Sequence, residues 1–294
     1  MLGVAFTGSA LAQDIEPRRW TPLPIGTNLV GIGVIHTEGE IAFDPVLKIE
    51  DARVEAKTVV ASFLHAFDFL GKSARFDLRV PLKRVRWKGL LDGQPRSVQR
   101  RGLGDPRLRW SVNLLGAPAL RGEDFRAYRA AHRVNTVVGA ALAITLPLGE
   151  YKREKLLNLG GNRFVIRPQL GIVHTRGPWS FELTGSAFFY AENEEFFGES
   201  VREQDPLFAL QGHLIYVSAA GWWASLGAAH DWGGRSIVDG TRKDDRKRDL
   251  LFGISGGFPL GKTAGVKIAY VGSRTQEKVG SDTDSLALAV SIRF

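Results

Sequence analysis

Residues 285–294, at the end of the chain, read Ser-Leu-Ala-Leu-Ala-Val-Ser-Ile-Arg-Phe. The even-numbered positions carry large apolar side chains, and the odd-numbered positions carry small or polar ones. Successive side chains of a β-strand point to opposite faces, so as a strand this segment has one apolar and one wet face. It predicts a strand that separates an apolar phase from water.

The same alternation returns along most of the chain, often with charged residues on the wet face. Apolar residues of 74–82 alternate with Arg75, Asp77 and Arg79. A second apolar sheet cannot pack on such a face, because buried unpaired charges are costly. Strand and turn signals predict about twelve strands of this kind. They lie at residues 30–36, 59–69, 74–82, 107–115, 136–146, 164–174, 179–190, 208–217, 222–232, 250–258, 266–272 and 285–294.

The connections between these strands alternate between tight turns and long charged segments, which is typical of outer-membrane barrels. Trp222 and Trp232 lie at opposite ends of one strand and would place a ring at each membrane interface, whereas a soluble β-core would hold such rings at strand middles. We therefore predict an all-β fold, a transmembrane antiparallel β-barrel of about 12 strands, with short periplasmic turns and long extracellular loops. Residues 116–133 form the exception, a long periplasmic connection with a short helix expected at 123–133.

The composition limits the chemistry that the chain can perform. Its 294 residues include no Cys, one Met and 34 Gly. This excludes disulfides, Cys-based zinc or iron–sulfur sites and a cysteine nucleophile. The mean hydropathy of -0.08 suits a barrel as well as a soluble protein, because lumen-facing polar residues offset lipid-facing apolar ones. Glycines within strands, such as Gly171 and Gly253, suit a tightly curved wall.

The N-terminal region predicts export. Residues 1–12 form a short apolar run that ends in Ala10-Leu11-Ala12, the small-x-small pattern of a secretory cleavage site, but without a basic n-region. We interpret 1–12 as a truncated signal peptide, residues 13–27 as a Pro-rich periplasmic lead or plug, and 28–294 as the outer-membrane barrel. An apolar N-terminal strand is the alternative for 1–12.

The net charge of +8 favours an anionic partner, and export makes that partner a lipid phosphate or a solute rather than a nucleic acid. A basic lumen lowers the energy of anions in a narrow pore. The same residues could instead pair with acids and brace the barrel. The charged side chains that alternation places in the lumen are Arg75, Arg79, Arg107, Arg109, Arg167, Lys267, Arg293, Asp77, Glu182 and Asp231.

A second basic group lies in the connection 83–104, on the predicted outer face. It includes Arg84, Arg86, Lys88, Arg100 and Arg101, opposed only by Asp92. Such side chains bind lipopolysaccharide phosphates well. An acidic loop at 192–205 could pair with this group or remain solvated.

Enzyme motifs are weak. Gly253-Ile254-Ser255-Gly256-Gly257 matches G-x-S-x-G, but it lies inside an alternating strand without the helix that a nucleophile elbow needs. A barrel-embedded lipid-modifying enzyme would need a lipid-facing Ser beside His174 or His230, and the nearby serines point inward. No histidine has a partner at metal-ligand spacing. We expect no enzymatic activity, no cofactor and no metal.

Several short motifs resemble a known family. They are Gly102-Leu103-Gly104-Asp105-Pro106, Leu146-Pro147-Leu148-Gly149-Glu150, Asn158-Leu159-Gly160-Gly161-Asn162, Trp232-Gly233-Gly234-Arg235 with Asp239-Gly240, and the terminal Phe294. Together they resemble the outer-membrane transporter family named for the MetA-pathway of phenol degradation, over most of the mature chain. Leu148 stands where that family usually has Thr. The resemblance implies a β-barrel and passage of hydrophobic or aromatic compounds, and it brings no catalytic residues.

These observations predict a cell outer membrane channel or transporter for small solutes, among them hydrophobic or aromatic compounds, with a basic lumen. Outer-membrane lipid, lipopolysaccharide and the barrel assembly machinery are the expected partners, and Phe294 is the expected assembly signal. The alternatives are the lipid-modifying enzyme and a structural or adhesive barrel with a sealed lumen.

Overall fold

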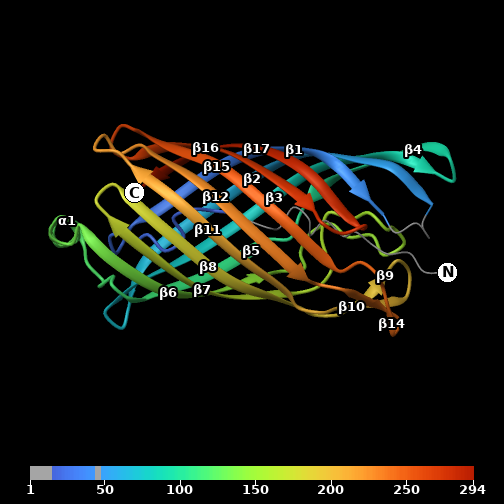
Figure 1. Ribbon diagram of the computed structural model, residues 1–294, viewed down its shortest axis with the longest axis horizontal. Coiled ribbons are helices and arrows are strands. Elements are labelled where there is room, and N and C mark those ends of the chain that lie inside the picture. Colours follow the sequence, from blue (N-terminus) through green and yellow to red (C-terminus); the bar gives the residue numbers. More distant parts are fainter. Residues whose placement is uncertain (1–14, 44–47) are drawn as a thin grey trace.

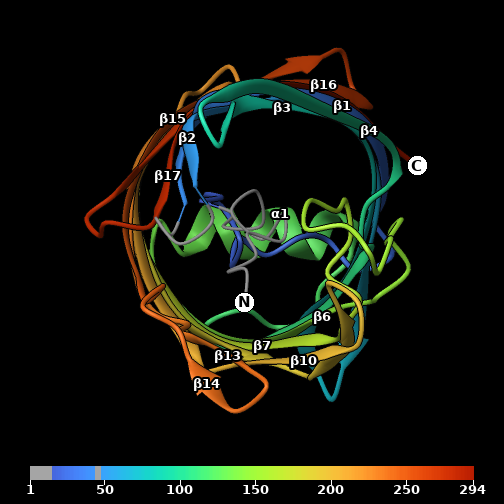
Figure 2. The ribbon, with the colours of Figure 1, turned by 90° about the vertical axis from the view of Figure 1, so that its right-hand side faces the viewer.

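The structure is a computed structural model that describes residues 15–43 and 48–294 (Figure 1). Twelve strands form a closed antiparallel barrel, as predicted, and β17 pairs with β1 to complete the ring (Figure 2). The barrel strands are β1 (Asn28–Ala42), β2 (Ile49–Phe69), β3 (Lys72–Leu91), β5 (Arg107–Leu115), β6 (Val134–Thr145), β7 (Val165–Arg176), β8 (Trp179–Tyr190), β11 (Leu207–Val217), β12 (Trp223–Gly233), β15 (Lys247–Leu260), β16 (Ala264–Thr275) and β17 (Gly280–Arg293).

The outer wall is apolar. Along β17, Leu286 and Ile292 are 55% and 51% exposed, whereas the intervening Ala287 is half-buried against the lumen. Trp222 and Trp232 are also exposed on this outer face, near the two ends of β12. Polar side chains such as Gln169 and Thr184 face inward on other strands and are fully buried. The period-two pattern therefore sorts side chains between lipid and lumen in the way that a membrane barrel requires.

The segment that we expected to be a basic loop at 83–104 is a β-hairpin. Strand β3 continues to Leu91, turns at Asp92-Gly93, and returns as β4 (Gln94–Leu103). Asp92 and Gly93 both have positive φ, which fits a tight hairpin turn. The hairpin was not apparent from the sequence because β4 carries charged residues on both faces, and in β3 Val85 and Trp87 alternate with charged residues over a short stretch only. β2 is also longer than predicted: in its added part Ala52, Val54 and Ala56 are buried on one face, and most of the charged residues lie on the other.

Two other long connections form a separate small sheet at the same end of the barrel. β9 (Asn193–Phe196) and β10 (Ser200–Gln204) come from one connection, and β13 (Ser236–Val238) and β14 (Thr241–Arg242) come from the next. Phe196 and Val238 pack together beneath it. Figure 1 shows this sheet and β4 at the end opposite α1.

The other end has tight turns, both ends of the barrel sequence and the predicted short helix, α1 (Gly122–Ala131). Glu123 and Asp124 lie in the first turn of α1, where acidic side chains oppose the positive end of the helix dipole. No helix in the described part of the chain is long and apolar enough to span a membrane. The predicted signal peptide, residues 1–12, lies outside the described residues.

Candidate functional site

The N-terminal segment 15–27 lies inside the barrel before β1 begins (Figure 2). Trp20 is its anchor and is 0% exposed. The indole Nε1 donates a hydrogen bond to Thr184 Oγ1 of β8 at 2.8 Å, and the Arg109 guanidinium lies over the ring at 5.1 Å. Ala117, Val137 and Val173 complete the apolar part of this contact.

Two facing glycines make room for the indole. Gly139 of β6 and Gly171 of β7 are cross-strand partners. A Cβ on either residue would overlap the Trp20 ring. Glycine is therefore required at these positions by the close approach of Trp20 and not by wall curvature, which was our interpretation of Gly171 from the sequence.

Ion pairs of Glu16 attach the start of the segment to the barrel wall. Arg79 Nη2 donates to both carboxylate oxygens, at 2.6 and 2.5 Å, and Lys267 Nζ lies 3.7 Å from Oε1. Burial alone would raise the pKa of Glu16, but Arg79, Lys267 and Arg19 hold the pKa well below its usual range. The carboxylate is therefore ionised at neutral pH.

Further charged contacts form a belt across the lumen at this level. Asp77 accepts a hydrogen bond from Arg75 at 3.1 Å and from Arg109 at 3.4 Å, and Arg109 Nε also donates to Gln169. Opposite them, Glu182 is 0% exposed and accepts a hydrogen bond from the Arg19 backbone N–H. Segment 15–27 and this belt together narrow the lumen.

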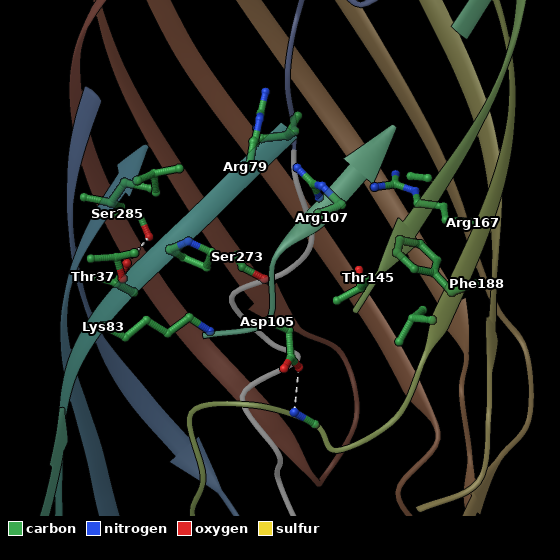
Figure 3. A pocket seen from close by; sticks show the side chains of 18 of the residues that line it. Thr37, Arg79, Lys83, Asp105, Arg107, Thr145, Arg167, Phe188, Ser273 and Ser285 are labelled. Carbon is green, nitrogen blue, oxygen red and sulfur yellow. Dashed lines mark hydrogen bonds between the residues drawn. The ribbon is translucent and has the colours of Figure 1, made fainter. Parts of the chain in front are cut away.

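A cavity of about 320 Å³ lies on the extracellular side of the belt (Figure 3). Its lining includes Ile15 of the N-terminal segment. β1, β15, β16 and β17 lie on one side and, apart from Lys247 at the start of β15, contribute small or apolar side chains. Thr37 Oγ1 and Ser285 Oγ on this side share a hydrogen bond of 2.7 Å. The basic residues in the lining are Arg79, Lys83, Arg107, Arg163, Arg167 and Lys247.

Asp105 holds an extracellular connection over this cavity. Its carboxylate accepts hydrogen bonds from the backbone N–H groups of Gly149 and Gly161, at 2.9 and 2.7 Å. Burial raises the pKa of Asp105, while these two hydrogen bonds and Lys83 oppose the rise. The motifs that carry the family resemblance, at 102–106, 146–150 and 158–162, thus meet at one place in the fold.

The structure brings most of the predicted lumen residues together. Arg75, Arg79, Arg109, Asp77, Lys267 and Glu182 lie in or beside the belt, and Arg107 and Arg167 line the cavity. Asp231 is 2% exposed on β12. Arg293 differs: it is exposed at the periplasmic rim, where it donates to the Lys262 carbonyl. Alternation predicts which face of the barrel wall Arg293 lies on, but not its position along the barrel axis.

The lipid-facing histidines do not pair with serine in the part of the chain that the structure describes. His174 shares a hydrogen bond with Thr136 Oγ1 at 2.9 Å, and His230 lies 3.2 Å from the Asp249 carbonyl. Among the described residues, no group of three His, Asp or Glu side chains is placed to hold a metal ion.

Sequence reasoning missed Glu16, Trp20, Asp105 and Arg163. Glu16 and Trp20 precede the first strand, where no periodicity points to the lumen. The space that Trp20 fills could have been located from Gly139 and Gly171, because two inward-facing glycines opposite each other on adjacent strands leave room for a ring.

A family model described as "Putative MetA-pathway of phenol degradation" matches residues 39–281. The chain belongs to this family. Its fold is shared by the COG4313 outer membrane channel from Pseudomonas putida F1, with a TM-score of 0.76 and 22% identity over 96% of this chain and 100% of that one. The transport unit of the autotransporter AIDA-I from Escherichia coli has a TM-score of 0.52 at 7% identity, over 96% and 93%. No curated protein matches the chain.

The family and the fold together make this chain an outer-membrane β-barrel. Nothing in the family description or in the lipid face of the described residues assigns it an enzymatic step.

Proposed function

We propose that this family member is a passive outer-membrane channel for small solutes, including hydrophobic and aromatic compounds, and that residues 13–27 act as a plug. The observation that supports the proposal best is the cavity of about 320 Å³ between the extracellular loops and the N-terminal segment. Ligand sites typically have this size and an apolar lining with a few polar groups. The neighbour in P. putida F1, which is described as an outer membrane channel, adds support from the fold.

The plug is held by contacts that can break without disturbing the wall. Trp20 and Glu16 attach residues 15–24 to β3, β8 and β16 through their side chains, and Arg19 does so through its backbone N–H. Backbone hydrogen bonds to Leu120 and Ala66 hold only the last residues of the segment, 25–27. None of the twelve strands pairs with residues 15–24. Undocking of the segment therefore opens a path from the cavity to the periplasm. A sealed structural barrel is the alternative, and it predicts that the segment never leaves.

The basic belt sets the charge preference of the path. Arg75 and Arg109 share the single carboxylate of Asp77, so the local field favours anions. The test is the reversal potential of the refolded protein in a planar bilayer under a salt gradient. Anion preference that decreases in Arg75→Ala and Arg109→Ala supports the proposal. Absence of conductance, or cation preference that both variants leave unchanged, contradicts it.

The basic hairpin is proposed to bind phosphates of the outer-leaflet lipid. Lys57, Arg84 and Arg101 are direct cross-strand partners on β2, β3 and β4, and all three are exposed. Like charges directly opposite each other destabilise a sheet, and among the described residues Glu55 alone, with Oε1 3.7 Å from Lys57 Nζ, offsets part of this charge, so a bound anion would stabilise the row. Leu82 and Val59 lie two residues nearer the membrane on the same face and are also exposed, which puts the row at the level of lipid head groups.

The last proposed partner is the barrel assembly machinery, with Phe294 as the residue recognised. Its side chain is 68% exposed, while its backbone exchanges two hydrogen bonds with Asn28, each of 3.1 Å, at the β1–β17 seam. The ring is therefore not needed to close the barrel and is available to another protein.

A further inference from the structure

The cavity has two chemically different sides (Figure 3). Thr37, Ser273 and Ser285 lie on one side, with Lys83 at its lower edge, whereas Arg167 and Phe188 lie on the other. The first side also carries Ile35, Leu251, Val271 and Ala287. Of the described lining residues, Asp105 alone is acidic, and its two oxygens already accept backbone hydrogen bonds.

The basic side contains two arginines that are stacked on aromatic rings. The Arg167 guanidinium lies 4.3 Å from the Phe188 ring centre, and the Arg163 guanidinium lies 4.6 Å from that of Tyr190. We call these two pairs the arginine–aromatic ladder. Stacking fixes each guanidinium plane through its face, so hydrogen bonds form at its edge. Arg167 Nη2 donates to Ser186 Oγ at 3.0 Å, and both arginines line the cavity.

Arg163 in particular has unused hydrogen-bonding capacity. It is 4% exposed and donates through Nη2 to Gln204, but its buried Nη1 has no hydrogen-bond partner in the part of the chain that the structure describes. Burial, together with the Arg202 cation, lowers the pKa of Arg163 to about 9, so it is still charged at neutral pH. A buried, charged donor without a partner is costly, and an anion would relieve that cost.

We propose that the cavity binds an amphipathic carboxylate, with the carboxylate on the arginine–aromatic ladder and the apolar body against the β15–β17 side. This deepens the proposed channel function and rests on it for the route by which the solute arrives. At about 30 Å³ per water-sized group, a volume of about 320 Å³ accommodates a solute of roughly ten non-hydrogen atoms. A neutral solute of that size would not offset the positive charge of Arg163 and Arg167, and a cation would be repelled.

The experiment measures binding by equilibrium dialysis of the protein in lipid nanodiscs, with empty nanodiscs to subtract partitioning into lipid. Phenylacetate, 3-phenylpropanol and 3-phenylpropylamine are matched probes that differ in charge, and octanoate tests an alkyl body in place of a ring. We expect either carboxylate to bind about tenfold or more tightly than the matched alcohol, and the amine to bind most weakly. Equal affinities for acid, alcohol and amine would overturn the proposal.

Substitutions of the two ladder arginines test whether the carboxylate binds at the ladder. Arg167→Gln and Arg163→Gln should remove the preference for acid over alcohol and leave alcohol binding in place. Arg163→Lys should restore only part of it, because lysine lacks the planar fork. Arg53→Gln is the matched control, since Arg53 is an exposed extracellular residue outside the cavity lining. If Arg53→Gln lowers the preference as much as the ladder variants do, the site assignment is wrong.

Arg163→Gln could disturb folding through Gln204, so heat-modifiable migration on a gel is checked for each variant, and Arg167→Gln provides an independent test. Binding in nanodiscs does not require passage. If the parent protein conducts but binds acid and alcohol equally, the site alone is contradicted. Acid preference without any conductance contradicts the channel and leaves the site standing.

Discussion

Removing the Trp20 side chain should release the N-terminal segment from the lumen. Trp20→Ala deletes a fully buried ring, its hydrogen bond to Thr184 and its contact with Arg109. Truncation of a buried Trp typically costs about 3–5 kcal/mol. Burial of roughly 150–250 Å² at about 25 cal/mol per Å² gives a similar figure, about 4–6 kcal/mol.

This free energy belongs to docking of the segment and not to closure of the barrel, because Trp20 is part of no strand pair. At about 1.4 kcal/mol per factor of ten, the ratio of docked to undocked segment should fall by two to four orders of magnitude. In single-channel recordings we expect the fraction of time in a high-conductance state to rise by at least about 100-fold.

Trp222→Ala is the matched control, since it removes the same side chain from the lipid-facing surface, where Trp222 is 38% exposed. Heat-modifiable migration on a gel establishes that each variant is folded. If folded Trp20→Ala shows the same conductance and open fraction as the parent, the plug reasoning is refuted.

Four further predictions concern the plug, the surface and assembly. Gly171→Ala should raise the open fraction as Trp20→Ala does, because the added Cβ overlaps the indole. Gly185→Ala is the control and should not raise it, since nothing lies within 4 Å of the added carbon. Equal open fractions of the two variants would contradict the proposed fit of Trp20 against Gly139 and Gly171. The lowered pKa of Glu16 means that its stabilisation of docking is complete above about pH 4.5 and is lost as pH falls through the lowered value. The ratio of open probability in Glu16→Gln to that in the parent should therefore be constant from about pH 8 to 5 and fall only in stronger acid, and a ratio that falls between pH 7 and 5 would contradict this. Changing Arg84 and Arg101 to Ser should weaken lipopolysaccharide binding and its salt dependence in a sedimentation assay, while the same change at Arg126 of α1 should have no effect. Phe294→Ala should lower the amount of barrel in the outer-membrane fraction without lowering the unfolding temperature of the refolded protein. A lowered unfolding temperature together with normal assembly would instead indicate a structural role for Phe294.

The barrel could be predicted from the sequence because each spanning strand separates lipid from water and must therefore alternate. The boundaries expected for 107–115 and 179–190 coincide with β5 and β8. The alternation was a weaker guide beyond the membrane, where Val85 of β3 is buried against Val54 and Leu159 but both faces of β4 carry charged residues. Charged strands and charged loops then have the same composition, and cross-strand pairing alone distinguishes them.

Alternation predicted the side of the wall for the lumen residues but not their partners. Arg79 was expected to face inward, yet its partner Glu16 lies 63 positions away in a segment without periodicity. Arg293 shares the inward parity but lies at the rim. Contacts of this kind depend on how the N-terminal segment threads the closed barrel, and no local pattern encodes that path.

The central claim is that solutes cross the membrane through this lumen. Its most direct test is uptake of a labelled aromatic solute by Gram-negative cells with an otherwise low-permeability outer membrane that express the barrel or its cavity-filling variant Ala287→Trp. The account predicts faster uptake with the parent barrel and a return to background with Ala287→Trp at equal outer-membrane abundance. Uptake that is the same with parent, variant and no barrel would contradict it.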